Sequence, residues 1–172
     1  MEKEFLGLLV YCIPALVTGA IAFLFFREHT DNENNRRNFI LKEQHRKEVL
    51  PIKLQAYERL ALLLERIAPH HLLKRVAPIS PQVRDYKNLL INTIEQEYEH
   101  NLSQQIYVSD PCWRMLSAAK NSSIQIIMAM EDTAVESAED ARPLLLDALS
   151  KSEITPSRAL AFLKDEIATE LR

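Results

Sequence analysis

The sequence predicts an all-α protein, with an N-terminal transmembrane helix followed by an antiparallel bundle of about four main helices. Apolar residues recur at helical spacing along most of the chain, which is the pattern of amphipathic helices. The pairs Ser80-Pro81, Asp110-Pro111 and Thr155-Pro156 each place an oxygen-bearing capping residue before a proline, as at the first turn of a helix. The β-favouring run 106–108 is too short to make a strand. Helices alone therefore account for the pattern.

Composition and hydropathy divide the chain into three expected parts. Residues 1–27 are predicted to be a transmembrane anchor, residues 28–50 a polar and basic juxtamembrane segment, and residues 51–172 a soluble helical-bundle domain. The last part is long enough to bury a core of its own.

The expected anchor contains twenty-two consecutive residues without a charge, from Phe5 to Phe26. A helix of this length extends about 33 Å, which is enough to cross a hydrocarbon layer of about 30 Å. Pro14 lies inside the run, but membrane helices tolerate proline. A cleaved signal peptide is disfavoured, because the chain start is not basic and Phe25-Phe26-Arg27 offers no small residues for cleavage. A buried core helix without any polar face would be rare.

Basic residues predict the orientation of this anchor. Lys3 is the only basic side chain before it, whereas Arg27 and five further basic residues follow it closely: Arg36, Arg37, Lys42, Arg46 and Lys47. We therefore expect a single-pass protein of the bacterial inner (cytoplasmic) membrane, with its N-terminus outside and its C-terminal domain in the cytoplasm. The segment 36–47 holds five basic residues and one acid, so it is expected near the anionic inner leaflet. Alternatively, these side chains only set the topology and solvate a helix.

Small residues form a stripe on one face of the predicted anchor, namely Ala15, Thr18, Gly19 and Ala22. Such a stripe lets a second membrane helix approach closely. It makes a homo-oligomer through the membrane helix a candidate, although small residues are common in any membrane helix.

The distribution of glycine excludes several classes of enzyme. Gly7 and Gly19 are the only glycines, so none occurs from Ala20 to Arg172. Phosphate-binding loops, the dinucleotide-binding fingerprint and the nucleophile elbow all require glycine, and we expect no cofactor. The formal charge of −3 argues against a nucleic-acid partner.

The elements were assigned in chain order from these patterns. The polar residues 30–35 are predicted to be a linker or frayed turn, after which the chain is helical from Arg36. Pro51 either begins the next helix or kinks a continuous one. Residues 52–68 form the predicted core helix, and Pro69 ends it before a short turn with His70 and His71. The apolar stripe of this helix is Ile52, Ala56, Leu60, Leu63, Leu64 and Ile67, widened by Leu54, Ala61 and Leu62.

Three further main helices and one short helix are expected after residue 80. They cover 81 to about 105, 111 to about 130, and 156 to the end, with the short helix at 143–149 after an acidic segment. The predicted core positions of the three are, in order, Val83, Tyr86, Leu90, Ile94, Tyr98, Leu102 and Ile106; Trp113, Leu116, Ile124, Ile127 and Met128; and Leu160, Leu163, Ile167 and Leu171.

Three features of the sequence are candidates for a metal site or a reactive side chain. Glu97 and His100 have the Glu-x-x-His spacing of di-metal bundles, but such a site requires the motif twice, so the pair is a weak metal candidate. The neighbours His70 and His71 would point about 100° apart on a helix and would not hold one ion together. Cys112 near a helix start could be an activated thiol, although burial beside Trp113 is more common. No catalytic set emerges.

Several segments carry a resemblance to a known family. With 54–60, 64–67, 99–109 and Trp113, the chain resembles an uncharacterised family of small single-pass membrane proteins of Bacteroidota, over roughly residues 1–130. The resemblance implies an anchored helical domain and no catalytic residue. It draws attention to the polar stretch Asn101, Ser103, Gln104 and Gln105, which either satisfies a backbone turn or faces a partner.

These observations favour a membrane-anchored helical adaptor that binds another protein and has no catalytic activity. The lipid bilayer and one protein are the expected partners. The alternative is a metal-binding helical-bundle enzyme that uses Glu97 and His100.

Overall fold

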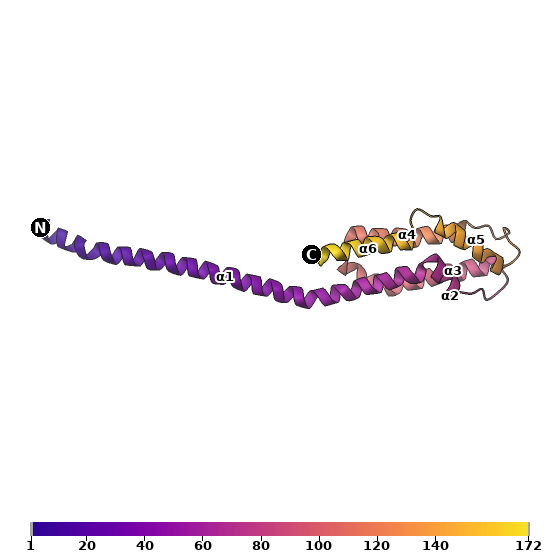
Figure 1. Cartoon of the computed structure of the whole chain (residues 1–172), viewed down its shortest axis with the longest axis horizontal. Coiled ribbons are helices and arrows are strands. Elements are labelled where there is room, and N and C mark those ends of the chain that lie inside the picture. The colour runs from indigo at the N-terminus through magenta and orange to yellow at the C-terminus, as the bar shows by residue number, and fades with distance from the viewer. Residues whose placement is uncertain (1, 172) are drawn as a thin grey trace. The chain divides into compact units, whose positions relative to one another are not determined.

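Helices make up every regular element of the chain that the structure describes (Figure 1). The structure is a computed structural model, which describes the backbone of residues 2–171 and the side chains of 17–23, 25–27, 33, 36–37, 39–44, 46–169 and 171. The elements in order are α1 (Glu2–Ile67), α2 (Pro69–Arg75), α3 (Val83–His100), the 3₁₀ helix η1 (Leu102–Tyr107), α4 (Asp110–Ala129), α5 (Ala138–Ser150) and α6 (Pro156–Glu170). The expected all-α class is confirmed, with no strand between residues 2 and 171.

The chain separates into two compact units, unit 1 (Met1–Leu50) and unit 2 (Pro51–Arg172). The expectation of a linker at 30–35 is wrong, because α1 is helical through it. No glycine or proline lies between Glu28 and Leu50, and asparagine or aspartate costs a helix less than about 0.7 kcal/mol per residue. Pro51 lies inside α1 and does not begin a new helix.

The described part of the chain contains no helix that is both long and apolar enough to span a bilayer. Most of the predicted anchor, from Phe5 to Leu16, lies outside the described side chains.

Unit 2 is built from four long helical segments, which are residues 51–67 of α1 together with α3, α4 and α6. α4 packs against α3, α5 and α6 (Figure 1). Glu95 near the end of α3 contacts Lys120 in the middle of α4, whereas Lys87 near the start of α3 contacts Asp132 beyond the end of α4. α3 and α4 therefore run in opposite directions, as expected for helices joined by a short connection.

One apolar core holds unit 2 together. The buried side chains that form it include Leu60, Leu63, Leu64, Ile67, Tyr86, Leu90, Ile94, Leu116, Ile127, Leu145 and Leu163. Most predicted core positions are confirmed, but six are exposed: Ile52, Leu62, Leu102, Ile106, Met128 and Leu171. Leu62 lies five residues before the end of α1 and on the side of that helix away from the core, which leaves 57% of it exposed.

The three proline-marked helices begin within two residues of the predicted starts, and one of the three predicted caps is confirmed. Thr155 caps α6 as expected, accepting a hydrogen bond from Arg158 N. Ser109, not Asp110, caps α4 and accepts from Cys112 N. α3 begins only at Val83, and the Ser80 hydroxyl instead accepts from Gln82 N at 3.1 Å.

Three short elements differ from expectation. Pro69 ends α1 and also begins α2, so the predicted turn containing His70 and His71 is helical. α3 stops at His100 and the chain continues as η1, which shortens the helix predicted to reach about 105. α5 starts at Ala138, earlier than predicted, because Ser137 caps it through Asp140 N.

Candidate functional site

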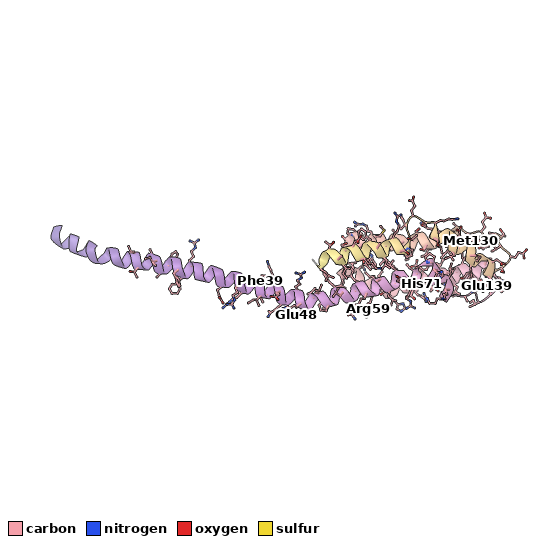
Figure 2. All side chains as sticks on the ribbon, viewed as in Figure 1. Phe39, Glu48, Arg59, His71, Met130 and Glu139 are labelled. Carbon is pink, nitrogen blue, oxygen red and sulfur yellow. The ribbon has the colours of Figure 1, made fainter. Side chains whose placement is uncertain are left out.

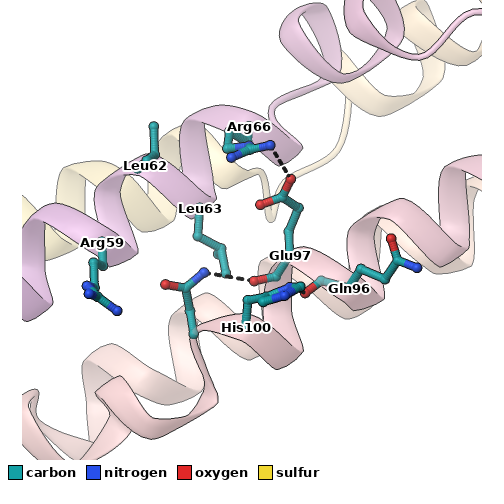
Figure 3. A pocket seen from close by; sticks show the side chains of 8 residues that line it. Arg59, Leu62, Leu63, Arg66, Gln96, Glu97 and His100 are labelled. Atoms are coloured by element: carbon teal, nitrogen blue, oxygen red, sulfur yellow. Dashed lines mark hydrogen bonds and ion pairs between the residues drawn. The ribbon is translucent and has the colours of Figure 1, made fainter.

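A pocket of about 350 Å³ lies between α1 and α3 and contains the residues that the sequence marked as metal candidates (Figure 3). We call it the α1–α3 pocket; it is lined by Arg59, Leu62, Leu63, Arg66, Gln96, Glu97, His100 and Asn101. Its walls combine two arginine side chains with two leucines. The pocket is therefore a mixed basic and apolar surface.

Ion pairs occupy the carboxylate of Glu97. Its Oε1 lies 2.8 Å from Arg66 Nη2 (Figure 3). The same oxygen lies 3.4 Å from Arg75 Nη1, so Glu97 links the end of α1 and α2 to α3. His100 donates from Nδ1 to the Gln96 carbonyl at 2.8 Å. No three His, Cys, Asp or Glu side chains gather into a metal-ligand set in the described part of the chain. The geometry thus gives Glu97 a role in holding helices together.

The polar stretch after α3 is divided between structure and surface. Asn101 ends α3, and its Nδ2 donates to the Glu97 carbonyl at 2.9 Å. Gln104 is buried, with Nε2 3.2 Å from Ser103 Oγ. Ser103 and Gln105 are exposed. Asn101 therefore satisfies a backbone carbonyl at the end of α3, which is the first of the two roles expected for this stretch.

The five basic residues of the predicted membrane-surface segment are all exposed: Arg36, Arg37, Lys42, Arg46 and Lys47. Two of them pair with acids one turn earlier on α1, Arg37 with Glu33 at 3.9 Å and Lys47 with Glu43 at 2.7 Å. The hydrogen bond and the charge of Lys47 lower the pKa of Glu43.

The predicted helix-packing stripe is only partly described. Thr18, Gly19 and Ala22 are exposed, and a Cβ added at Gly19 would meet nothing within 4 Å. Ala15 lies outside the described side chains.

A second cluster, which the sequence did not reveal, joins α1, α4 and α6 through Glu166. Tyr57 OH donates to Glu166 Oε1 at 2.6 Å, and Ser109 donates to the same carboxylate from its backbone N at 3.1 Å and from its hydroxyl. Burial pushes the pKa of Glu166 upward, but the hydrogen bonds from Ser109 and Tyr57 outweigh it and hold the pKa below the ordinary 4.5. We call this the Glu166 clasp.

Cys112 lies buried beside the clasp, at the start of α4. Burial, reinforced by the Glu166 carboxylate, raises the pKa of this thiol to about 12. The expectation that Cys112 is buried is therefore confirmed, and an activated thiol is disfavoured because loss of solvation outweighs the effect of the helix start.

The folded chain is expected to protect Cys112 from thiol reagents. In a Cys12→Ser variant, where Cys112 is the only thiol, reaction with a disulfide reagent at pH 8 should be at least about 100-fold slower than in denaturant, since only about one thiol in 10⁴ is ionised at a pKa of about 12. Absorbance of the released reagent measures both rates. Equal rates in the two conditions would contradict the burial of this thiol.

A second pocket, of about 460 Å³, lies between the end of α4 and α5. We call it the α4–α5 groove; it is lined by Ile126, Ala129, Met130, Glu131, Ala134, Leu144, Leu145 and Ala148. Figure 2 places Met130 and Glu139 toward the same end of unit 2. The sequence feature that lies at this groove is the acidic segment between α4 and α5, which supplies Glu131 to its lining.

The comparisons with known proteins give a family but no activity. The model of a family described as a family of unknown function, DUF7935, matches residues 3–170. No curated protein and no solved structure matches the chain. The expectation of a family without an assigned function is confirmed, whereas occurrence in Bacteroidota and a single-pass topology stay predictions. With almost its whole length covered by that match, the chain belongs to the DUF7935 family of unknown function.

Proposed function

We propose that this protein is a membrane-anchored helical adaptor, whose unit 2 binds another protein in the cytoplasm. The proposal is supported by the contacts of the ionisable side chains, which pair with groups on neighbouring helices. Glu97 holds α1 and α2 against α3, Glu166 holds α1 and α4 against α6, and Lys120 binds Glu95 at 2.9 Å. These groups therefore stabilise the packing of neighbouring helices, which is a structural role.

Exposed apolar side chains supply the surface that an adaptor needs. Leu62 borders the α1–α3 pocket and is 57% exposed, while Leu144 borders the α4–α5 groove and is 49% exposed. Apolar side chains that border hollow surfaces are typical of protein-binding sites. The proposal therefore assigns recognition of the partner protein to the α1–α3 pocket and the α4–α5 groove.

The membrane anchor rests on the amino-acid sequence. The charge-free run from Phe5 to Phe26 has the length and apolar content of a spanning helix, and the basic residues after it favour a cytoplasmic unit 2. Exposed basic side chains at Arg36, Lys42 and Arg46 are available to the anionic inner leaflet. Self-association through Gly19 and its neighbours is a further part of the proposal.

Topology is tested with reporters fused after Arg172. We expect a reporter that is active only in the cytoplasm to work, and one active only outside to fail, because the basic flank stays inside. In the same cells the full chain should remain in the membrane pellet after alkaline carbonate. A signal only from the outside reporter would overturn the orientation, and release by carbonate would overturn the anchor.

The alternative enzyme makes a different prediction. A metalloenzyme using Glu97 and His100 would carry a transition metal in stoichiometric amount, and this metal would be lost in a Glu97→Ala, His100→Ala variant. Metal analysis of the full-length chain purified from membranes distinguishes the two functions. The adaptor proposal expects no metal that depends on these two residues, because Arg66 and Arg75 already bind the Glu97 carboxylate.

A further inference from the structure

We propose that the α4–α5 groove binds a basic amphipathic helix of a partner protein. This inference rests on the proposed adaptor function and names the surface and the chemistry of its partner. Three observations carry it: the apolar lining of the groove, the acidic charge around it, and a lysine that already docks at its edge.

The lining of the groove suits apolar side chains. Of its eight lining residues, Glu131 alone is ionisable, and Leu145 at the base is 1% exposed. Leu144 on the groove is 49% exposed, and Met130 also lines it. Methionine and leucine on such a surface adapt to an inserted apolar side chain, and burying them excludes water from both partners.

The segment from the end of α4 through α5, which supplies part of the groove, carries a net negative charge. Residues 131–150 contain six acids, namely Glu131, Asp132, Glu136, Glu139, Asp140 and Asp147, and a single base, Arg142. Arg142 is committed to Glu139 at 2.8 Å and to the Leu73 carbonyl at 2.8 Å. Asp132 and Asp147 are paired with Lys87 and Lys151, at 2.8 and 2.6 Å. Glu131 on the groove and the exposed Glu136 have no ion pair among the described residues. The groove thus presents an apolar floor beside a segment of net negative charge.

The contacts of Lys87 indicate that the edge of the groove at the end of α4 attracts a positively charged group. Its Nζ donates to the Met130 carbonyl at the end of α4 and to Asp132 Oδ1 at 2.8 Å. A helix C-terminus carries partial negative charge, so the end of α4 adds to the acids around the groove. A lysine or arginine of a partner would meet the same field beside Glu131.

The partner is a helix for two reasons. Every regular element around the groove is helical, so no sheet edge is offered for an extended peptide. A helix presents apolar side chains at i, i+3 or i+4 and i+7 on one face, with basic residues on its flanks to meet the acidic surround. An anionic membrane surface is disfavoured as the occupant, because the same acids would be repelled by it.

Binding is measured with three fluorescent synthetic peptides of about 14 residues, which share leucines on one helical face and differ in carrying lysine, glutamine or glutamate elsewhere. The full-length chain is held in nanodiscs of zwitterionic lipid, and the signal from empty nanodiscs is subtracted. We expect the lysine peptide to bind at least about tenfold more tightly than the glutamine peptide, and the glutamate peptide not to bind.

Variants locate the binding site. Leu144→Asp, and Glu131→Lys combined with Glu136→Lys, should each weaken binding of the lysine peptide about tenfold or more. Glu99→Lys makes the same kind of charge change at an exposed position at the end of α3 and should leave binding unchanged. An unfolding midpoint equal to that of the wild type, from Trp113 fluorescence, confirms that each variant is folded.

Equal affinity for the three peptides, or the same loss of binding in Glu99→Lys as in the groove variants, would overturn the assignment of this groove. Either result would leave the adaptor function standing on another surface, such as the α1–α3 pocket. The adaptor function is tested separately: it fails if the full-length chain, extracted from membranes in mild detergent, carries no protein partner.

Discussion

Replacing Leu60 by alanine is expected to lower the free energy of unfolding of unit 2 by about 3 kcal/mol. Leu60 is 0% exposed and packs in the core that α1 shares with the other long helices. Removal of its side chain loses apolar burial and leaves a cavity that the packed neighbours refill only in part. Urea unfolding followed by the fluorescence of Trp113, the only tryptophan in the chain, measures this change within unit 2.

Leu62→Ala is the matched control, because it removes the same atoms two residues further along the same helix. Leu62 is 57% exposed, so we expect a change of less than about 0.5 kcal/mol. Similar losses of unfolding free energy in Leu60→Ala and Leu62→Ala would contradict the assignment of Leu60 to the core face of α1 and Leu62 to its exposed face.

Replacing Glu166 by glutamine is expected to cost about 2 kcal/mol at neutral pH. The carboxylate accepts from Tyr57 OH and from both the backbone N and the hydroxyl of Ser109. Glutamine keeps one oxygen but points an NH₂ group at a donor, so at least one of these hydrogen bonds is lost. Asp165→Asn, an exposed change on the neighbouring position of α6, is the control and should have little effect.

The effect of Glu166→Gln depends on pH in a defined direction. Folding lowers the pKa of Glu166, so the contribution of the carboxylate is fully present above the ordinary pKa of 4.5 and is lost as the pH falls through the lower folded-state pKa. The difference in unfolding free energy between wild type and variant should therefore shrink below that pH. A difference that grows on acidification would show that the carboxylate is not held ionised by the clasp.

The helical class and most core positions could be predicted from the sequence because they depend on local periodicity. Leu60, Leu90 and Leu116 each belong to an apolar stripe at helical spacing on their own helix, and all three are buried. Boundaries were less predictable. The Thr155-Pro156 pair predicted its cap correctly, whereas Ser80 and Asp110 are not the caps of α3 and α4. α3 begins two residues later and α4 one residue earlier than predicted, since several nearby groups can stand at a helix start.

The contacts that organise the candidate sites could not be predicted, since they join residues far apart in the chain. Tyr57 and Glu166 are separated by 109 positions, and no spacing rule relates them. The Glu97–His100 spacing suggested a metal, whereas the approach of Arg66 and Arg75 gives Glu97 an ion-pairing role. The acidic segment 131–140 was visible in the sequence, but its place beside an apolar groove required the packing of α4 and α5.

Native mass spectrometry of the full-length chain, released from membranes in mild detergent, tests the central claim most directly. The account predicts that the chain leaves the membrane in a complex with a second protein in stoichiometric amount, and that Leu144→Asp removes this protein while Glu99→Lys retains it. A chain that emerges from the membrane alone, carrying a stoichiometric transition metal that Glu97→Ala abolishes, would contradict the adaptor function.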